Sequence, residues 1–95
     1  MAAITVHNLL NVERSPGGEA RIEVGLSERP DDDWIDAFGR QAQAAPTTLL
    51  SDAVVYPTKP SVELTTNAPL TTENDREVLE WLHAVVAATN DELAT

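Results

Sequence analysis

The spacing of apolar residues along this chain changes twice from the period of a strand to the period of a helix. Two segments with alternating apolar residues precede a segment with helical spacing, and the same order recurs in the second half of the chain. Alternation places side chains on opposite faces of a strand, whereas a spacing of three or four residues places them on one side of a helix. The pattern therefore predicts the element order ββαββα. The recurrence is one of architecture only, because the two halves share no matching residues.

The first two segments predict a β-hairpin. Residues 15–18 read Ser-Pro-Gly-Gly, a combination typical of a tight turn. After the turn, four apolar residues alternate with polar or small ones: Ala20, Ile22, Val24 and Leu26. Before the turn, the inner face of a strand is predicted to carry Ile4, Val6, Leu10 and Val12, and the outer face is predicted to carry Thr5, His7, Leu9 and Asn11. Asn8 breaks this alternation, and a β-bulge accommodates such a break.

Three consecutive aspartates, residues 31–33, precede the first segment with helical spacing. The apolar stripe that follows ends before Pro46 and consists of Trp34, Ile35, Phe38, Ala42 and Ala45. Asp31 or Asp32 is expected to accept a hydrogen bond from a free N–H group of the first turn, where negative charge also stabilises the helix dipole. The aspartates therefore predict the start of an amphipathic helix of about four turns.

A metal site is the competing interpretation of the same aspartates. Asp32 and Asp33 each lie three or four residues before Asp36, so these carboxylates could face a common point. Calcium takes about six to eight oxygen ligands, and the spacing of an EF-hand loop is absent. The capping interpretation is therefore favoured, and no metal ligand is assigned.

The second half of the chain predicts two short strands and a long helix. The strands are expected at residues 53–57 and 61–66, around a Pro-Thr-Lys-Pro connection that favours an edge position or a single bent strand. Val62 and Leu64 are expected to face inward, and Val55 outward. The helix is expected from residue 72 to about residue 90, with a broad apolar face made of Val78, Leu79, Leu82, Val85, Val86 and Thr89.

These elements predict one small domain, residues 1–95, of the α+β class. The expected architecture is a two-layer sandwich, in which a mostly antiparallel sheet of about four strands carries both helices on one face. A chain this short buries only about two-thirds of the surface that its unfolded form exposes. Its core must therefore be efficient or completed by a partner.

The charge of the chain is strongly negative. Six basic and 16 acidic residues give a formal net charge of −10, which argues against direct binding to nucleic acid or to an anionic membrane surface. Ten acidic residues lie in or beside the two predicted helices: Asp31, Asp32, Asp33, Asp36, Glu73, Asp75, Glu77, Glu80, Asp91 and Glu92. Their outward sides would form one acidic layer, which is either a solvated surface or one that attracts a basic partner.

Several classes of site find no support in the sequence. The chain contains no cysteine, which excludes disulfides and thiolate chemistry. His7 and His83 stand in no recognisable relation to a serine or a carboxylate, and no glycine-rich phosphate loop is present. The N-terminal residues do not have the pattern of a secretory signal, and no apolar stretch is long enough to span a membrane. We therefore expect a cytoplasmic protein that is not an enzyme and uses no cofactor.

The function favoured by these observations is that of an acidic protein–protein interaction module, such as a subunit, an adaptor or an inhibitor. The residues assigned to partner binding are Trp81, Glu77, Glu80, Glu73 and Asp36. Trp81 lies at the margin of its helix stripe, where it is either a core residue or a binding anchor. In a sharper version of the hypothesis, the acidic layer imitates nucleic acid and occupies a basic groove of the partner.

Two other functions stay open at this point. One is a metal-dependent binder or enzyme that uses Asp32, Asp33 and Asp36. The other is a self-assembling structural subunit, in which a homo-oligomer completes the small core.

Overall fold

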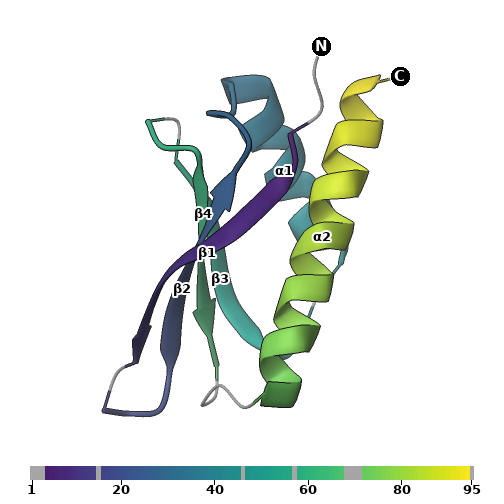
Figure 1. Ribbon diagram of the computed structural model, residues 1–95. Coiled ribbons are helices and arrows are strands. Elements are labelled where there is room, and N and C mark those ends of the chain that lie inside the picture. Colours follow the sequence, from purple (N-terminus) through teal and green to yellow (C-terminus); the bar gives the residue numbers. More distant parts are fainter. Residues whose placement is uncertain (1–3, 15, 46, 57, 68–71, 95) are drawn as a thin grey trace.

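Four strands and two helices follow one another along the chain in the predicted order ββαββα (Figure 1). A computed structural model describes residues 4–14, 16–45, 47–56, 58–67 and 72–94, without the side chains of Asn8 and of residues 72–74. The elements are β1 (Val6–Arg14), β2 (Ala20–Leu26), α1 (Asp32–Ala44), β3 (Leu50–Val55), β4 (Ser61–Thr66) and α2 (Thr72–Ala94). The predicted order and types of the elements are therefore confirmed. β3 begins three residues before the expected start at residue 53 and ends at Val55, and α2 extends four residues beyond the expected end at about residue 90.

The strands form one antiparallel sheet in the order β1-β2-β4-β3. The register places Val24 opposite Val62 and Ile22 opposite Leu64, so the predicted inner residues of β2 and β4 lie side by side. β3 and β1 form the two edges of the sheet. Of the two strands around the proline-rich connection, only β3 takes the expected edge position. β4 lies in the interior of the sheet, between β2 and β3. Pro60 does not interrupt the ladder of β4, because it precedes the strand.

Both helices pack on the same face of the sheet and enclose one core, which confirms the two-layer α+β sandwich. Trp34 and Phe38 of α1 are stacked, with ring centroids 5.5 Å apart. α2 contributes a buried face that consists of Val78, Leu82, Val85, Val86 and Thr89. The hydroxyl of Thr89 donates a hydrogen bond of 2.7 Å to the carbonyl oxygen of Val85, which satisfies this polar group inside the core. The described residues thus form a single small domain.

The triple aspartate caps α1, as the sequence predicted. Asp31 has extended backbone angles and accepts a hydrogen bond of 2.8 Å from the backbone N–H of Trp34. Asp32 and Asp33 occupy the first turn with exposed side chains, where they stabilise the helix dipole. Within the described part of the chain, no three histidine, aspartate or glutamate side chains are grouped so that they could hold a metal ion.

Replacing Asp31 with alanine is expected to destabilise the domain by about 1 kcal/mol, because the N–H of Trp34 loses its acceptor. Asp31→Asn should cost much less, since the amide oxygen still accepts the bond. Urea unfolding followed by circular dichroism measures both changes. If the two variants lose the same stability, the charge of Asp31 and not its hydrogen bond supports the helix.

Three details of the predicted sheet were wrong. Leu10, expected on the inner face of β1, is 58% exposed. Leu9, expected on the outer face, pairs with the buried Val24, because register shifts on both sides of Leu9 change the phase of the alternation within β1. Val55, also expected outside, lies opposite Val62 and is only 8% exposed. The run Ala53-Val54-Val55 contains no polar residue to fix its phase, so pairing with β4 decides which side chains face the core.

Candidate protein-binding groove

The structure separates the residues that the sequence assigned to partner binding. Trp81 is half-buried against the core, whereas Glu77, Glu80 and Asp36 are exposed. Glu77 lies one turn before Trp81 on the same side of α2, but Glu80 is turned about 100° away from Trp81. The side chain of Glu73 lies outside the described part of the structure. The predicted set is therefore not one site, and Trp81 is its best-defined member.

Trp81 joins α2 to the end of α1. Its indole N–H donates a hydrogen bond of 2.6 Å to the carbonyl oxygen of Ala45, the residue that follows α1. This bond fixes the ring in place and satisfies its polar group. The tryptophan is consequently part of the packing between the helices, and it also forms one wall of a groove.

The groove lies between α1 and the edge strand β3. It has a volume of about 340 Å³ and opens to the solvent. Its lining is Gly39, Ala42 and Gln43 of α1, Thr47, residues 50–53 of β3, and Trp81 of α2. Gly39 leaves room on the helix side, since a Cβ built there would have no heavy atom within 4 Å. Small residues on α1 therefore keep the space beside β3 open.

β3 has hydrogen-bonding groups that β4 does not use. The backbone N–H of Ala53 donates to the carboxylate of its neighbour Asp52 over 2.9 Å. A register shift occurs between Leu50 and Asp52, and the hydroxyl of Ser51 donates to the carbonyl oxygen of Thr65 over 3.3 Å. Ala53 thus presents an N–H at the groove that is satisfied only by a side chain at the surface.

The groove is acidic. Asp52 is one of its lining residues, and Asp36 lies one turn before Gly39 on the same side of α1. None of the residues that line the groove is basic. A positively charged group would therefore be attracted to this site.

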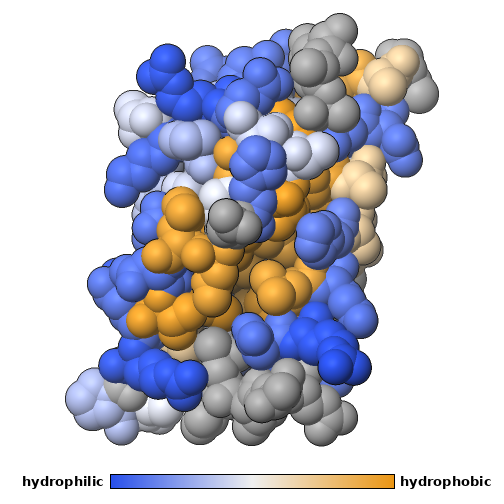
Figure 2. All heavy atoms as spheres, in the orientation of Figure 1, coloured by the Kyte–Doolittle hydropathy of each residue, from blue (hydrophilic) through white to orange (hydrophobic). Residues whose placement is uncertain are grey.

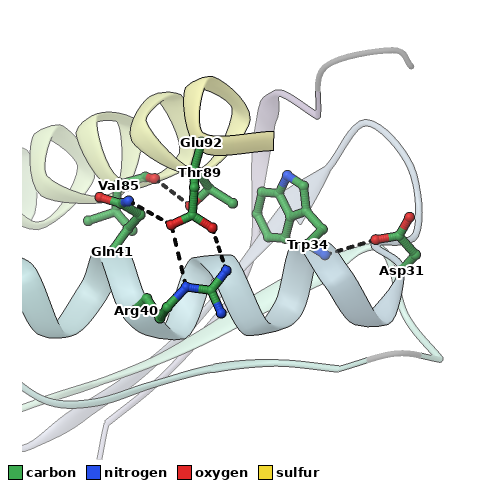
Figure 3. Close-up of polar contacts among 7 residues, drawn as sticks. All are labelled: Asp31, Trp34, Arg40, Gln41, Val85, Thr89 and Glu92. Carbon is green, nitrogen blue, oxygen red and sulfur yellow. Dashed lines mark hydrogen bonds and ion pairs between the residues drawn. The ribbon is translucent and has the colours of Figure 1, made fainter. Parts of the chain in front are cut away.

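The nearby cation Arg40 does not line the groove and points toward α2, although its charge also acts on Asp36 (Figure 3). Its guanidinium forms an ion pair with Glu92, in which Nε lies 3.4 Å from Oε1 and an Nη contacts the other carboxylate oxygen. Gln41 also donates a bond of 3.1 Å to Glu92. The hydrogen bonds from Arg40 and Gln41 lower the pKa of Glu92, and the bond to Glu92 raises the pKa of Arg40. The positive charge is therefore committed to the contact between the helices.

Sequence reasoning missed Gly39, Asp52 and Ala53 as members of a site. Gly39 interrupts a helical segment, which is a weak sign of a functional or packing requirement. The role of Asp52 and Ala53 depends on the edge position of β3, which is a property of the sheet order.

Comparison of the chain with protein-family models, with curated proteins and with solved structures found no match. In the part of the chain that the structure describes, neither helix combines the length and the apolar character that a membrane span requires.

Proposed function

We propose that this protein is a non-enzymatic binding module that holds an extended, basic segment of another protein in the groove between α1 and β3. The observation that carries this proposal is the open edge of β3 beside an acidic groove that is lined in part by Trp81. We propose a cytoplasmic location for this module.

Backbone pairing supplies the first part of the interaction. An extended segment that adds to β3 as a further antiparallel strand would accept the N–H of Ala53 with one of its own carbonyl oxygens. The carboxylate of Asp52, released from that N–H, can then bind a lysine or arginine of the segment. When the groove is empty, the hydrogen bond to the Asp52 carboxylate satisfies the backbone N–H of Ala53 at this edge of the sheet.

Side chains supply the second part. Successive side chains of a strand point to opposite faces, so every second residue of the segment would enter the space between β3 and α1. This space is bounded by Gly39, Ala42 and the ring of Trp81, which favours apolar side chains of moderate size. The residues between them would be basic, because the exposed carboxylate of Asp52 lies beside the groove.

The net charge of −10 extends this preference beyond the groove. Exposed acids on both helices, among them Asp32, Asp33, Glu77, Glu80 and Asp91, would raise the rate at which a basic segment approaches. The acidic helix layer then acts in steering, and the groove acts in binding. High salt should weaken the complex by slowing association.

A pair of short peptides tests the proposal. A six-residue peptide of alternating lysine and valine is expected to shift the backbone amide signals of β3 and the indole signal of Trp81 in NMR spectra. A peptide of alternating glutamate and valine, with the same length and strand propensity, should leave these signals unchanged. If neither peptide shifts any signal at millimolar concentration, the proposed function is wrong.

Gly39→Leu is expected to weaken binding of the lysine–valine peptide at least about tenfold, equivalent to about 1.4 kcal/mol. The added side chain would occupy the groove, and the free space at Gly39 lets it fit without a clash. The helix itself should gain about 1 kcal/mol, since leucine is a better helix former than glycine. Isothermal titration calorimetry measures the affinity.

Ala44→Leu is the matched control, because Ala44 is exposed on α1 and does not line the groove. It should bind the peptide as the unmodified protein does. Equal binding by the Gly39→Leu variant would place the peptide on the acidic helix layer and would contradict the groove site.

A further inference from the structure

The edge strand β1 carries an apolar surface at the opposite edge of the sheet from the groove. Among the described residues, the large apolar side chains left exposed are Leu9 and Leu10, at 47% and 58%. Figure 2 shows hydrophobic surface extending across the middle of the side of the molecule that faces the viewer, in the region between β1 and α2. Val6, Val12 and Leu79 are partly buried against the core in the same elements. Exposing two adjacent leucines at a sheet edge costs solubility unless something covers them.

The backbone of β1 is also open on one side. β1 has nine residues and pairs only with β2 in the four-stranded sheet. Leu9 and Asn11 pair with the consecutive residues Val24 and Glu23 of β2, so Leu10 is the extra residue of a bulge. Both leucines therefore lie in a strand whose outer N–H and C=O groups have no ladder partner in the described sheet. Another strand satisfies such an edge and covers its side chains at the same time.

The distribution of charge indicates what that strand belongs to. Within the segment Val6–Arg14, Glu13 and Arg14 balance each other, whereas the chain as a whole carries a net charge of −10. Two copies of so acidic a protein repel each other where their helices meet. β1 is a neutral segment, on which two copies can meet with little repulsion.

β1 is complementary to itself. Two identical strands that pair antiparallel about a two-fold axis present the same patch to each other. With the axis at Leu10, the leucines of the two chains pack together.

We propose that β1 pairs with β1 of a second copy of this chain, antiparallel about a two-fold axis at Leu10, so that the two sheets become one continuous sheet. This assembly goes beyond the binding role proposed above and does not depend on it. It leaves β3, the opposite edge of each sheet, accessible. A dimer would therefore present two grooves, and a partner with two basic segments would bind with higher avidity.

Light scattering coupled to size-exclusion chromatography tests the assembly directly. At about 100 µM the unmodified protein is expected to have twice the chain mass of 10.3 kDa, and dilution should shift it toward one chain mass. A mass of one chain at every concentration would overturn the proposal.

Leu10→Lys and Asn11→Lys form a matched pair of variants, because they add the same charge at neighbouring exposed residues of β1. Leu10→Lys places like charges at the axis and is expected to raise the dimer dissociation constant at least about tenfold. Asn11 faces the other side of the sheet opposite Glu23, so its lysine should leave the dimer intact. Equal dimerisation of both variants would show that the contact lies elsewhere.

Amide hydrogen exchange of the unmodified protein gives a second test that needs no substitution. Protection of the β1 amides that point away from β2 should rise with protein concentration, while amides of β3 should show no such change. A dimer that forms without added protection in β1 would contradict the pairing, whatever the variants do.

Discussion

Replacing Trp34 with alanine is expected to destabilise the domain by about 3–5 kcal/mol. The side chain is only 2% exposed, stacks on Phe38 and donates its indole N–H to Asn90 over 3.0 Å. Its removal leaves a large cavity in the core between α1 and α2, and the side-chain oxygen of Asn90 loses one of its donors. Because small domains have about 5–15 kcal/mol of stability, the variant should be largely unfolded under mild denaturing conditions. Urea unfolding followed by circular dichroism gives the loss.

Trp81→Ala is the comparison that separates a core residue from a groove residue. Trp81 is half-buried and makes one hydrogen bond, to Ala45, so its loss should cost about 1–3 kcal/mol. The same variant should bind the lysine–valine peptide more weakly, whereas Trp34 has no contact with the groove. A larger loss of stability for Trp81→Ala than for Trp34→Ala would mean that the end of α1, and not the centre of the core, limits the stability of the fold.

The local parts of this fold follow from the sequence because their causes are local. Alternation in residues 20–26, the cap at Asp31 and the apolar stripe of α2 each depend on neighbours within a few residues. The position of β4 between β2 and β3 depends instead on pairing across many residues, and no local pattern encodes it. The outer assignments of Leu9 and Val55 were wrong for the same reason, since a bulge and a cross-strand partner determine their faces.

The groove could be predicted only in part. Trp81 stood out because a large aromatic residue lay at the margin of an apolar stripe, and Asp36 because it belonged to an acidic helix. The opposite wall, residues 50–53, becomes part of a site only when β3 takes an edge of the sheet beside α1. For a site built from an edge strand and a helix, the sequence therefore predicts only the residues that the helix contributes.

No pattern in the sequence indicated the importance of Asn90. An asparagine near the end of a long helix normally lies at the surface and has polar neighbours. Here its side chain accepts the N–H of Ile4 over 3.3 Å and donates to the carbonyl oxygen of Ile4 over 2.7 Å, and it also accepts the indole N–H of Trp34. These contacts join the chain just before β1 to α1 and α2. The sequence separation of 86 residues between Asn90 and Ile4 explains why no local pattern marks the contact.

Asn90→Ala should therefore destabilise the domain by about 2–4 kcal/mol, because it leaves the buried indole N–H of Trp34 and the backbone groups of Ile4 without partners. Asp91→Ala is the matched control: Asp91 is exposed on the next position of α2 and should change stability by no more than about 0.5 kcal/mol. Urea unfolding measures both variants.

The Asn90→Ala variant should also show faster amide exchange in the first residues of β1 than in β4, since only β1 loses its anchor to α2. If its loss of stability equals that of Asp91→Ala, the β1 edge is held by packing alone, and the polar contacts of Asn90 contribute nothing measurable to the fold.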